Sequence, residues 1–216
     1  MKIVLFGAGG QVAQRIAHEA LERGHEVIGV VRSAATVRSY NEHLKIVEGD
    51  ATAPASVARL AKGADVIISA LSPRASPSGR PATSLPAAAR ALIAGAIQAG
   101  VRRLIVVGGA GSLEIAPGVR LVDAPSFPPE YKPESLDQVA ALDVYRTAAS
   151  ALDWTYISPA AEIGPGARTG NYRRSDDTLL VDSKGKSFIS YDDYAKAVID
   201  EIEHPTHSRA RMAVAY

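Results

Sequence analysis

The chain has 216 residues, of which 47% are hydrophobic and 22% are charged, and its formal net charge is +1. This composition is that of an ordinary globular protein, and so small a charge gives no overall field that would favour nucleic acid or an anionic membrane. Cysteine is absent, which excludes disulfides and thiolate chemistry, and no apolar run approaches the ~20 residues of a membrane helix. We therefore expect a cytoplasmic protein that binds no nucleic acid and no membrane. Because the five histidines are scattered, we also expect no metal site.

Short apolar runs, typical of strands, alternate with longer stretches that are typical of helices. We expect strands at Lys2–Phe6, His25–Val31, Leu44–Val47, Asp65–Leu71, Arg102–Val107, Asp153–Ser158 and Arg211–Ala215. We expect helices at Gln11–Arg23, Pro54–Lys62, Ala82–Ala99, Ser135–Ala149 and Tyr191–His204. This alternation predicts a single α/β domain over residues 1–216, built on a doubly wound, mostly parallel sheet of the Rossmann type.

Two loops interrupt this alternation. Ser72–Pro86 is rich in Ser, Pro and Gly, and Gly108–Pro133 is rich in proline. Each follows a strand, and ligands of open α/β sheets bind at the carboxyl ends of strands, so we expect both loops to border a binding site. Residues 159–190 form a small elaboration on the same side, with a hairpin at Asn171–Ser187 whose turn is Asp182–Gly185.

A glycine-rich turn, Gly7-Ala8-Gly9-Gly10, joins the first expected strand to the first expected helix. Such a turn brings backbone N–H groups close to a pyrophosphate, and the helix N-terminus adds about half a positive charge. The spacing is Gly-x-x-Gly-x-x-Ala, because Val12 occupies the place where G-x-G-x-x-G needs a third glycine. We expect this turn to bind a dinucleotide rather than only to end a strand. The expected contacts are Gly7, Ala8, Gly9, Gly10, Gln11 and Val12.

The ends of the second and third strands carry charged residues. Arg32 follows the second strand, where a guanidinium can pair with a ribose 2′-phosphate, and this favours NADP(H) over NAD(H). Asp50-Ala51 follows the third strand. Its carboxylate can hydrogen-bond the adenine amino group, or it can cap the helix that begins near Pro54; both alternatives stay open.

Small residues end the next two strands. Ser69-Ala70-Leu71 and Gly108-Gly109 would let the ribose and pyrophosphate of a cofactor lie against the backbone. Arg102-Arg103 begins the fifth strand, and we expect both side chains to be solvated.

Together, these segments resemble the atypical NAD(P)H-binding branch of the short-chain dehydrogenase/reductase superfamily, which includes NADH-flavin reductases, flavin/biliverdin reductases and NmrA-like sensors. The similarity covers essentially the whole chain. It is carried by Gly7–Gly10, Val31-Arg32, Gly49-Asp50, Asp65–Ala70, Arg103–Gly111, Leu152–Ala160 and Ile189–Ala195. The resemblance implies the strand order 3-2-1-4-5-6(-7) and places Pro159, at the end of the sixth strand, near the nicotinamide.

The chain departs from that superfamily at the catalytic pair. Catalytic members carry Tyr-x-x-x-Lys on the helix after the fifth strand, where the tyrosine donates a proton and the lysine lowers its pKa and holds the ribose. The family's spacing puts Glu134 and Gln138 at these positions, and neither can do that work. Tyr131 and Ser112 are the remaining candidates for catalysis. For Tyr131 the sequence favours an anchoring role in the proline-rich loop over catalysis, and the glycine run displaces Ser112 from the place of the superfamily's serine.

A chain without that acid suits hydride transfer from NADPH to a flavin, a quinone or a similar conjugated small molecule. The acceptor ring delocalises the incoming charge and solvent supplies the proton. The alternative is a non-catalytic NADP(H)-binding redox sensor of the NmrA-like kind. Nucleotide-sugar epimerase or dehydratase chemistry fits less well, because the region after the sixth strand is short. We expect a monomer or a homodimer.

Overall fold

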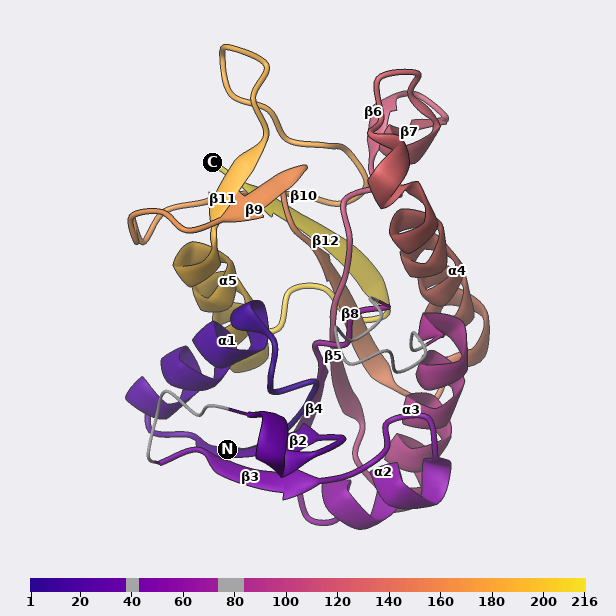
Figure 1. The fold of residues 1–216 in the computed structure, drawn as a ribbon, viewed down its shortest axis with the longest axis vertical. Coiled ribbons are helices and arrows are strands. Elements are labelled where there is room, and N and C mark those ends of the chain that lie inside the picture. Colours follow the sequence, from indigo (N-terminus) through magenta and orange to yellow (C-terminus); the bar gives the residue numbers. More distant parts are fainter. Residues whose placement is uncertain (38–42, 74–83) are drawn as a thin grey trace.

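Eight strands form one sheet in the order β10-β12-β8-β5-β4-β1-β2-β3 (Figure 1). The computed structural model describes residues 1–37, 43–73 and 84–216. The strands of this sheet are β1 (Lys2–Phe6), β2 (Glu26–Val31), β3 (Lys45–Glu48), β4 (Val66–Ser69), β5 (Arg103–Val107), β8 (Asp153–Ser158), β10 (Arg173–Ser175) and β12 (Ala210–Ala215). All run parallel except β10, which pairs antiparallel with β12 at one edge. The predicted order is confirmed, with β8 and β12 as the sixth and seventh strands.

Helices cover both faces of this sheet (Figure 1). They are α1 (Gln11–Glu22), α2 (Pro54–Ala61), α3 (Leu85–Ala99), α4 (Lys132–Ala148) and α5 (Tyr191–Glu203). Helices α1 and α5 share one apolar core, and α2, α3 and α4 share the other. The period-two alternation of a strand explains the division, because Ile3 and Leu5 of β1 belong to the first core while Val4 and Phe6 belong to the second.

The helices begin and end close to the predicted positions, with one clear difference. Helix α4 begins at Lys132 instead of Ser135, because the 3-10 turn η3 (Pro129–Tyr131) leads directly into it. Pro133 then lies in the first helical turn, where its missing N–H costs nothing. Helix α3 begins at Leu85, and the hydroxyl of Ser84 accepts the N–H of Ala87 at 3.5 Å. The expected start of this helix at Ala82 lies outside the described residues.

Several short elements lie in segments that the sequence predicted as loop or hairpin. Strand β6 (Glu114–Ala116) pairs with β7 (Val119–Arg120), and β9 (Glu162–Gly164) pairs in parallel with β11 (Phe188–Ser190). The expected turn at Asp182–Gly185 forms, with the Gly185 N–H donating to the Asp182 carbonyl at 3.0 Å. Strand β10, before this turn, pairs with β12 rather than with the chain after the turn. Two further 3-10 turns are η1 (Ala34–Thr36) and η2 (Leu121–Asp123).

The side chain of Arg103 is buried, whereas the sequence predicted that it would be solvated. Its guanidinium donates to the Glu201 carboxylate at 3.0 Å and to the Thr155 hydroxyl at 2.8 Å, and its side chain is only 13% exposed. Arg102 remains exposed, as expected. The pair Arg103–Glu201 thus joins the amino end of β5 to helix α5. It lies at the end of the parallel strands opposite to the glycine turn. A helix with the length and apolarity to cross a membrane is absent from the described ranges.

Candidate functional site

The glycine turn after β1 is fixed by its two neighbouring strands. The N–H groups of Gly7 and Ala8 both donate to the carbonyl of Val30 on β2, at 3.0 and 3.2 Å. Gly7 has φ +84°, and a Cβ there would lie 2.4 Å from the carbonyl oxygen of Ala70, just after β4. Only glycine fits this position, for conformational and steric reasons together. The predicted residue Ala70 therefore lies against the turn, as a backbone neighbour of Gly7.

The first turn of α1 leaves its backbone N–H groups open. Gly10 is the N-cap residue, no side chain caps the helix, and the first turn carries no acidic residue. Gly9, Gly10 and Gln11 are exposed, while the Gln14 side chain fixes the turn from below by donating to the Ala8 carbonyl at 2.6 Å. An uncapped helix N-terminus behind a glycine turn is an anion-binding site. These residues fit a dinucleotide pyrophosphate.

Arg32 and Asp50 lie close together beside this turn, at the ends of β2 and β3. Both side chains are exposed. Two hydrogen bonds from Thr52, assisted by the positive charge of Arg32, hold the pKa of Asp50 below its ordinary value. The residue before helix α2 is Ala53, and no side chain caps that helix, so Asp50 closes its own turn instead of capping α2. Ala51 is buried beneath this turn.

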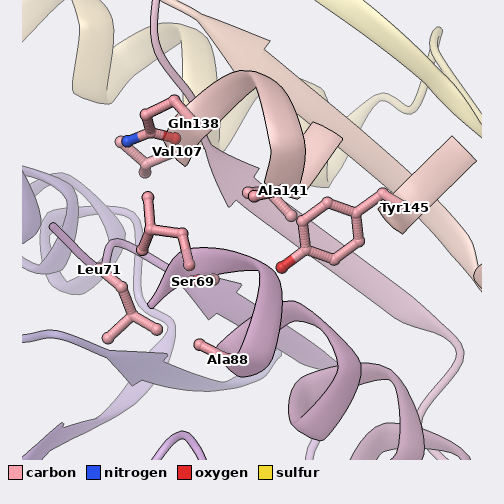
Figure 2. Close-up of a pocket in the computed structure, with 9 residues that line it drawn as sticks. Ser69, Leu71, Ala88, Val107, Gln138, Ala141 and Tyr145 are labelled. Carbon is pink, nitrogen blue, oxygen red and sulfur yellow. The ribbon is translucent and has the colours of Figure 1, made fainter. Parts of the chain in front are cut away.

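A pocket lies at the carboxyl ends of β4 and β5, between helices α3 and α4 (Figure 2). The predicted residues Ser69 and Leu71 line it, and Val107 forms its wall on β5. The full lining is Ser69, Leu71, Leu85, Ala88, Val106, Val107, Gln138, Ala141 and Tyr145. None of these described residues carries a formal charge.

The Tyr145 hydroxyl points into this pocket from α4 (Figure 2). Burial raises its pKa, the nearby Tyr156 raises it further, and a hydrogen bond with Ser69 offsets part of the shift. A phenol whose pKa is raised gives up its proton less readily than a free tyrosine does. Tyr145 therefore contributes polarity and shape to the pocket, but little acidity.

Gln138 is the other polar side chain on α4 that lines the pocket. The Gly109 N–H donates to the Tyr156 hydroxyl at 3.2 Å. This hydroxyl has two acceptors on Gln138, the side-chain Oε1 at 2.9 Å and the main-chain carbonyl oxygen at 3.2 Å. Gly108 packs directly on the same ring, because a Cβ there would lie 2.0 Å from Cε1 of Tyr156. The glycines after β5 therefore bring the backbone of this strand, the ring of Tyr156 and helix α4 together.

The carboxyl end of β8 also contacts Gly109, in the glycine run after β5. Ser158 is fully buried, and its hydroxyl donates to the carbonyl oxygen of Gly109 at 2.9 Å. Pro159 follows it and is also buried. The structure thus places Pro159 beside the glycine run after β5.

The two candidate catalytic residues lie elsewhere. The Ser112 hydroxyl is buried and accepts a hydrogen bond from the guanidinium of Arg211 at 2.8 Å. Tyr131 is 53% exposed, at the start of α4. Neither residue lines the pocket. Ser112 instead helps Arg211 to join the segment after β5 to the segment around Asp177, whose carbonyl accepts the N–H of Glu114 at 2.8 Å.

The contact between Tyr156 and Gln138 is not evident from the sequence. The only sequence signal was alternation on the sixth strand, which puts Tyr156 and Ser158 on the same face. Which residue this face meets depends on the position of α4, and no local pattern encodes that position.

Comparison with known proteins identifies the family to which this chain is similar. Residues 7–205 match the family described as NAD(P)H-binding. The protein YwnB of Bacillus subtilis (strain 168) is 42% identical over 218 residues, covering 99% of this chain and 98% of YwnB.

Three solved structures are also similar over the whole chain. A "putative exported protein" from Burkholderia pseudomallei is 42% identical with a TM-score of 0.87, and the match covers 100% of both chains. A "putative epimerase" from Bacteroides thetaiotaomicron is 41% identical with a TM-score of 0.88, over 100% of this chain and 96% of the other. A "putative NADH-flavin reductase" from Streptococcus pneumoniae TIGR4 is 34% identical with a TM-score of 0.82, over 100% of this chain and 99% of the other.

Proposed function

This chain belongs to the NAD(P)H-binding family, and from that premise we propose that it is an NADPH-dependent reductase of a flavin, a quinone or a similar conjugated acceptor. The observation that carries the proposal is the uncapped N-terminus of α1, which follows the glycine turn that β2 and β4 hold in place. When bound there, the dinucleotide would supply the hydride. The chain's own part is to hold the pyrophosphate at α1 and to shape the pocket beside β4 and β5.

The nature of the pocket supports a conjugated acceptor. Its described lining has no carboxylic acid, imidazole or amine, and its single tyrosine has a raised pKa. A carbonyl or alcohol substrate needs a proton donor at the reacting oxygen, whereas a flavin or quinone delocalises the charge and takes its proton from solvent. The contribution that these mostly apolar walls can make is to keep water away from the reacting rings beside them.

Arg32 supports the choice of NADPH. It lies exposed at the end of β2, close to Asp50 and beside the glycine turn that would hold the pyrophosphate. A guanidinium there pairs with a 2′-phosphate, and an acidic residue in its place would repel it. The name of the Streptococcus relative also agrees with a flavin-type acceptor, while the name of the Bacteroides relative makes epimerisation the reaction to test against it.

The test is a titration of the purified protein with NADPH and NADH, followed by addition of FMN and of a small panel of quinones while the absorbance of the reduced nicotinamide is recorded. We expect binding with preference for NADPH, and oxidation that depends on the acceptor. Tight binding without turnover of any acceptor would contradict the reductase and leave a redox sensor. Turnover of a nucleotide sugar without net oxidation of the dinucleotide would instead indicate an epimerase.

A further inference from the structure

The connection between β9 and β10 is attached to the rest of the protein mainly by polar contacts. We call residues 165–171 of this connection the strap. These residues are exposed, apart from the half-buried Gly170, and none of them belongs to either apolar core. Partly buried side chains that pack against the first core flank the strap on both sides, namely Ile163 and Tyr172. The strap therefore has fixed ends and a middle without a hydrophobic anchor.

The first attachment of the strap is an ion pair with helix α1. The guanidinium of Arg168 donates to the carboxylate of Glu19 at 2.9 Å. Glu19 is only 4% exposed, whereas the side chain of Arg168 is 45% exposed. The same carboxylate also accepts a hydrogen bond from Arg23 at 2.6 Å. Glu19 would therefore keep a cationic partner if the strap moved away.

The second attachment is a carboxylate at the start of helix α5. The N–H groups of Thr169 and Gly170 donate to the two oxygens of Asp193, at 2.8 Å each, and the Thr169 hydroxyl donates to the same group. Asp193 is fully buried and also accepts the hydroxyl of Tyr216. Helices α1 and α5 pack side by side (Figure 1), so the strap is bound to both helices of the first core.

We propose that the strap opens and closes as one unit while the sheet stays folded, and that the Arg168–Glu19 ion pair sets how often it opens. Strands β9 and β10 have their own partners, β11 and β12, so they stay paired when the strap is open. Opening exposes little apolar surface, so it costs much less than global unfolding. Because one attachment is an ion pair with a half-exposed partner, salt favours the open form. The strap binds no part of the dinucleotide, and this inference does not depend on the proposed function.

The test is amide hydrogen exchange of the whole chain, followed by NMR at the two amides that donate to Asp193. We expect Thr169 and Gly170 to exchange with the same opening constant, and low concentrations of urea should hardly change it. The amides inside β1 should instead exchange only through global unfolding, which urea promotes. Raising the salt concentration from about 0.05 M to about 0.5 M should increase the opening constant of the strap about threefold.

Arg168→Met tests the role of the ion pair, because it removes the charge at similar side-chain length. We expect the opening constant to rise about fivefold at both Thr169 and Gly170, although neither amide bonds to Arg168, and most of the salt effect to disappear. Arg15→Met is the matched control. Arg15 also links α1 to α5, through Asp192 at 3.6 Å, but this pair contains no residue of the strap. The control should leave both amides unchanged.

Three results would overturn the inference. Unchanged exchange in Arg168→Met would mean that the ion pair does not hold the strap. A response of only one of the two amides would mean that the strap does not move as a unit. Exchange that depends on urea as strongly as that of β1 would mean that these amides open only by global unfolding.

Discussion

At the scale of single residues, the candidate site depends on side chains that are absent as much as on those present. The first turn of α1 has neither a cap nor an acid, although both would stabilise the helix. A position that forgoes a stabilising charge is most easily understood where an anionic ligand binds.

Gln11→Glu tests this directly, because Gln11 is exposed in that turn. The new carboxylate should stabilise the helix by about 0.5 kcal/mol through the helix dipole, yet weaken NADPH at least tenfold by repelling the pyrophosphate. Thermal unfolding and ligand titration measure the two effects separately, with Gln98→Glu as the control on α3. A variant that keeps its NADPH affinity would show that the anion binds elsewhere.

Arg32→Asp tests the choice of cofactor. We expect the ratio of NADPH to NADH affinity to fall by about two orders of magnitude, since a charge-assisted pair is replaced by repulsion. Arg15→Asp provides a matched change of charge, because Arg15 is exposed on α1. If the ratio stays the same in Arg32→Asp, another residue reads the 2′-phosphate.

At the scale of elements, the sequence was sufficient where a segment is defined by its own pattern. Strands such as β1, β4 and β5 are continuous apolar runs, and this is what burial on both faces requires. Strands β9 and β11 were not predicted, because each has three residues and they are held mainly by each other. The hydrogen bonds from Gly109 to Tyr156 and from Tyr156 to Gln138 were also not predicted, because they join elements that lie far apart in the sequence.

The N-terminus of α5 makes a further prediction at this scale. Asp193 is buried there, and its carboxylate accepts hydrogen bonds from Thr169, Gly170 and Tyr216. Burial alone would raise the pKa of Asp193, but these hydrogen bonds outweigh it and the pKa is lowered. The carboxylate thus anchors the segment that connects β9 to β10.

A group with a lowered pKa stabilises the fold above the pKa of the unfolded chain, about 4, and this contribution is lost as the pH falls through the folded value. Asp193→Asn should therefore lower the free energy of unfolding by about 2 kcal/mol at pH 7 and by progressively less below pH 4. Urea unfolding across this range measures the difference. Asp192→Asn, on the neighbouring and more exposed residue, is the control; a difference independent of pH would contradict the assignment.

At the scale of the whole molecule, the Arg103–Glu201 pair joins the central sheet to α5 at the amino ends of the strands, opposite to the candidate site. Removing one partner of a buried pair leaves an uncompensated charge, which costs about 3–5 kcal/mol, whereas removing both can be nearly neutral. Glu201→Met should therefore unfold at much lower urea concentration than Arg103→Met/Glu201→Met. NADPH affinity should hardly change in the folded double variant. A double variant less stable than the single one would mean that the pair contributes net stability.

Strand β1 lies between β2 and β4, in the interior of the sheet, and separates the two cores. On the ribosome, β1 is therefore made before either of its neighbours, and its second neighbour is incomplete until Ser69 has been added. Its apolar side chains stay exposed on both faces of the strand while that length of chain is synthesised. Pairing of β1 with both of its neighbours should consequently wait until β4 has been made, and until then β1 should be open to chaperones that recognise extended apolar segments.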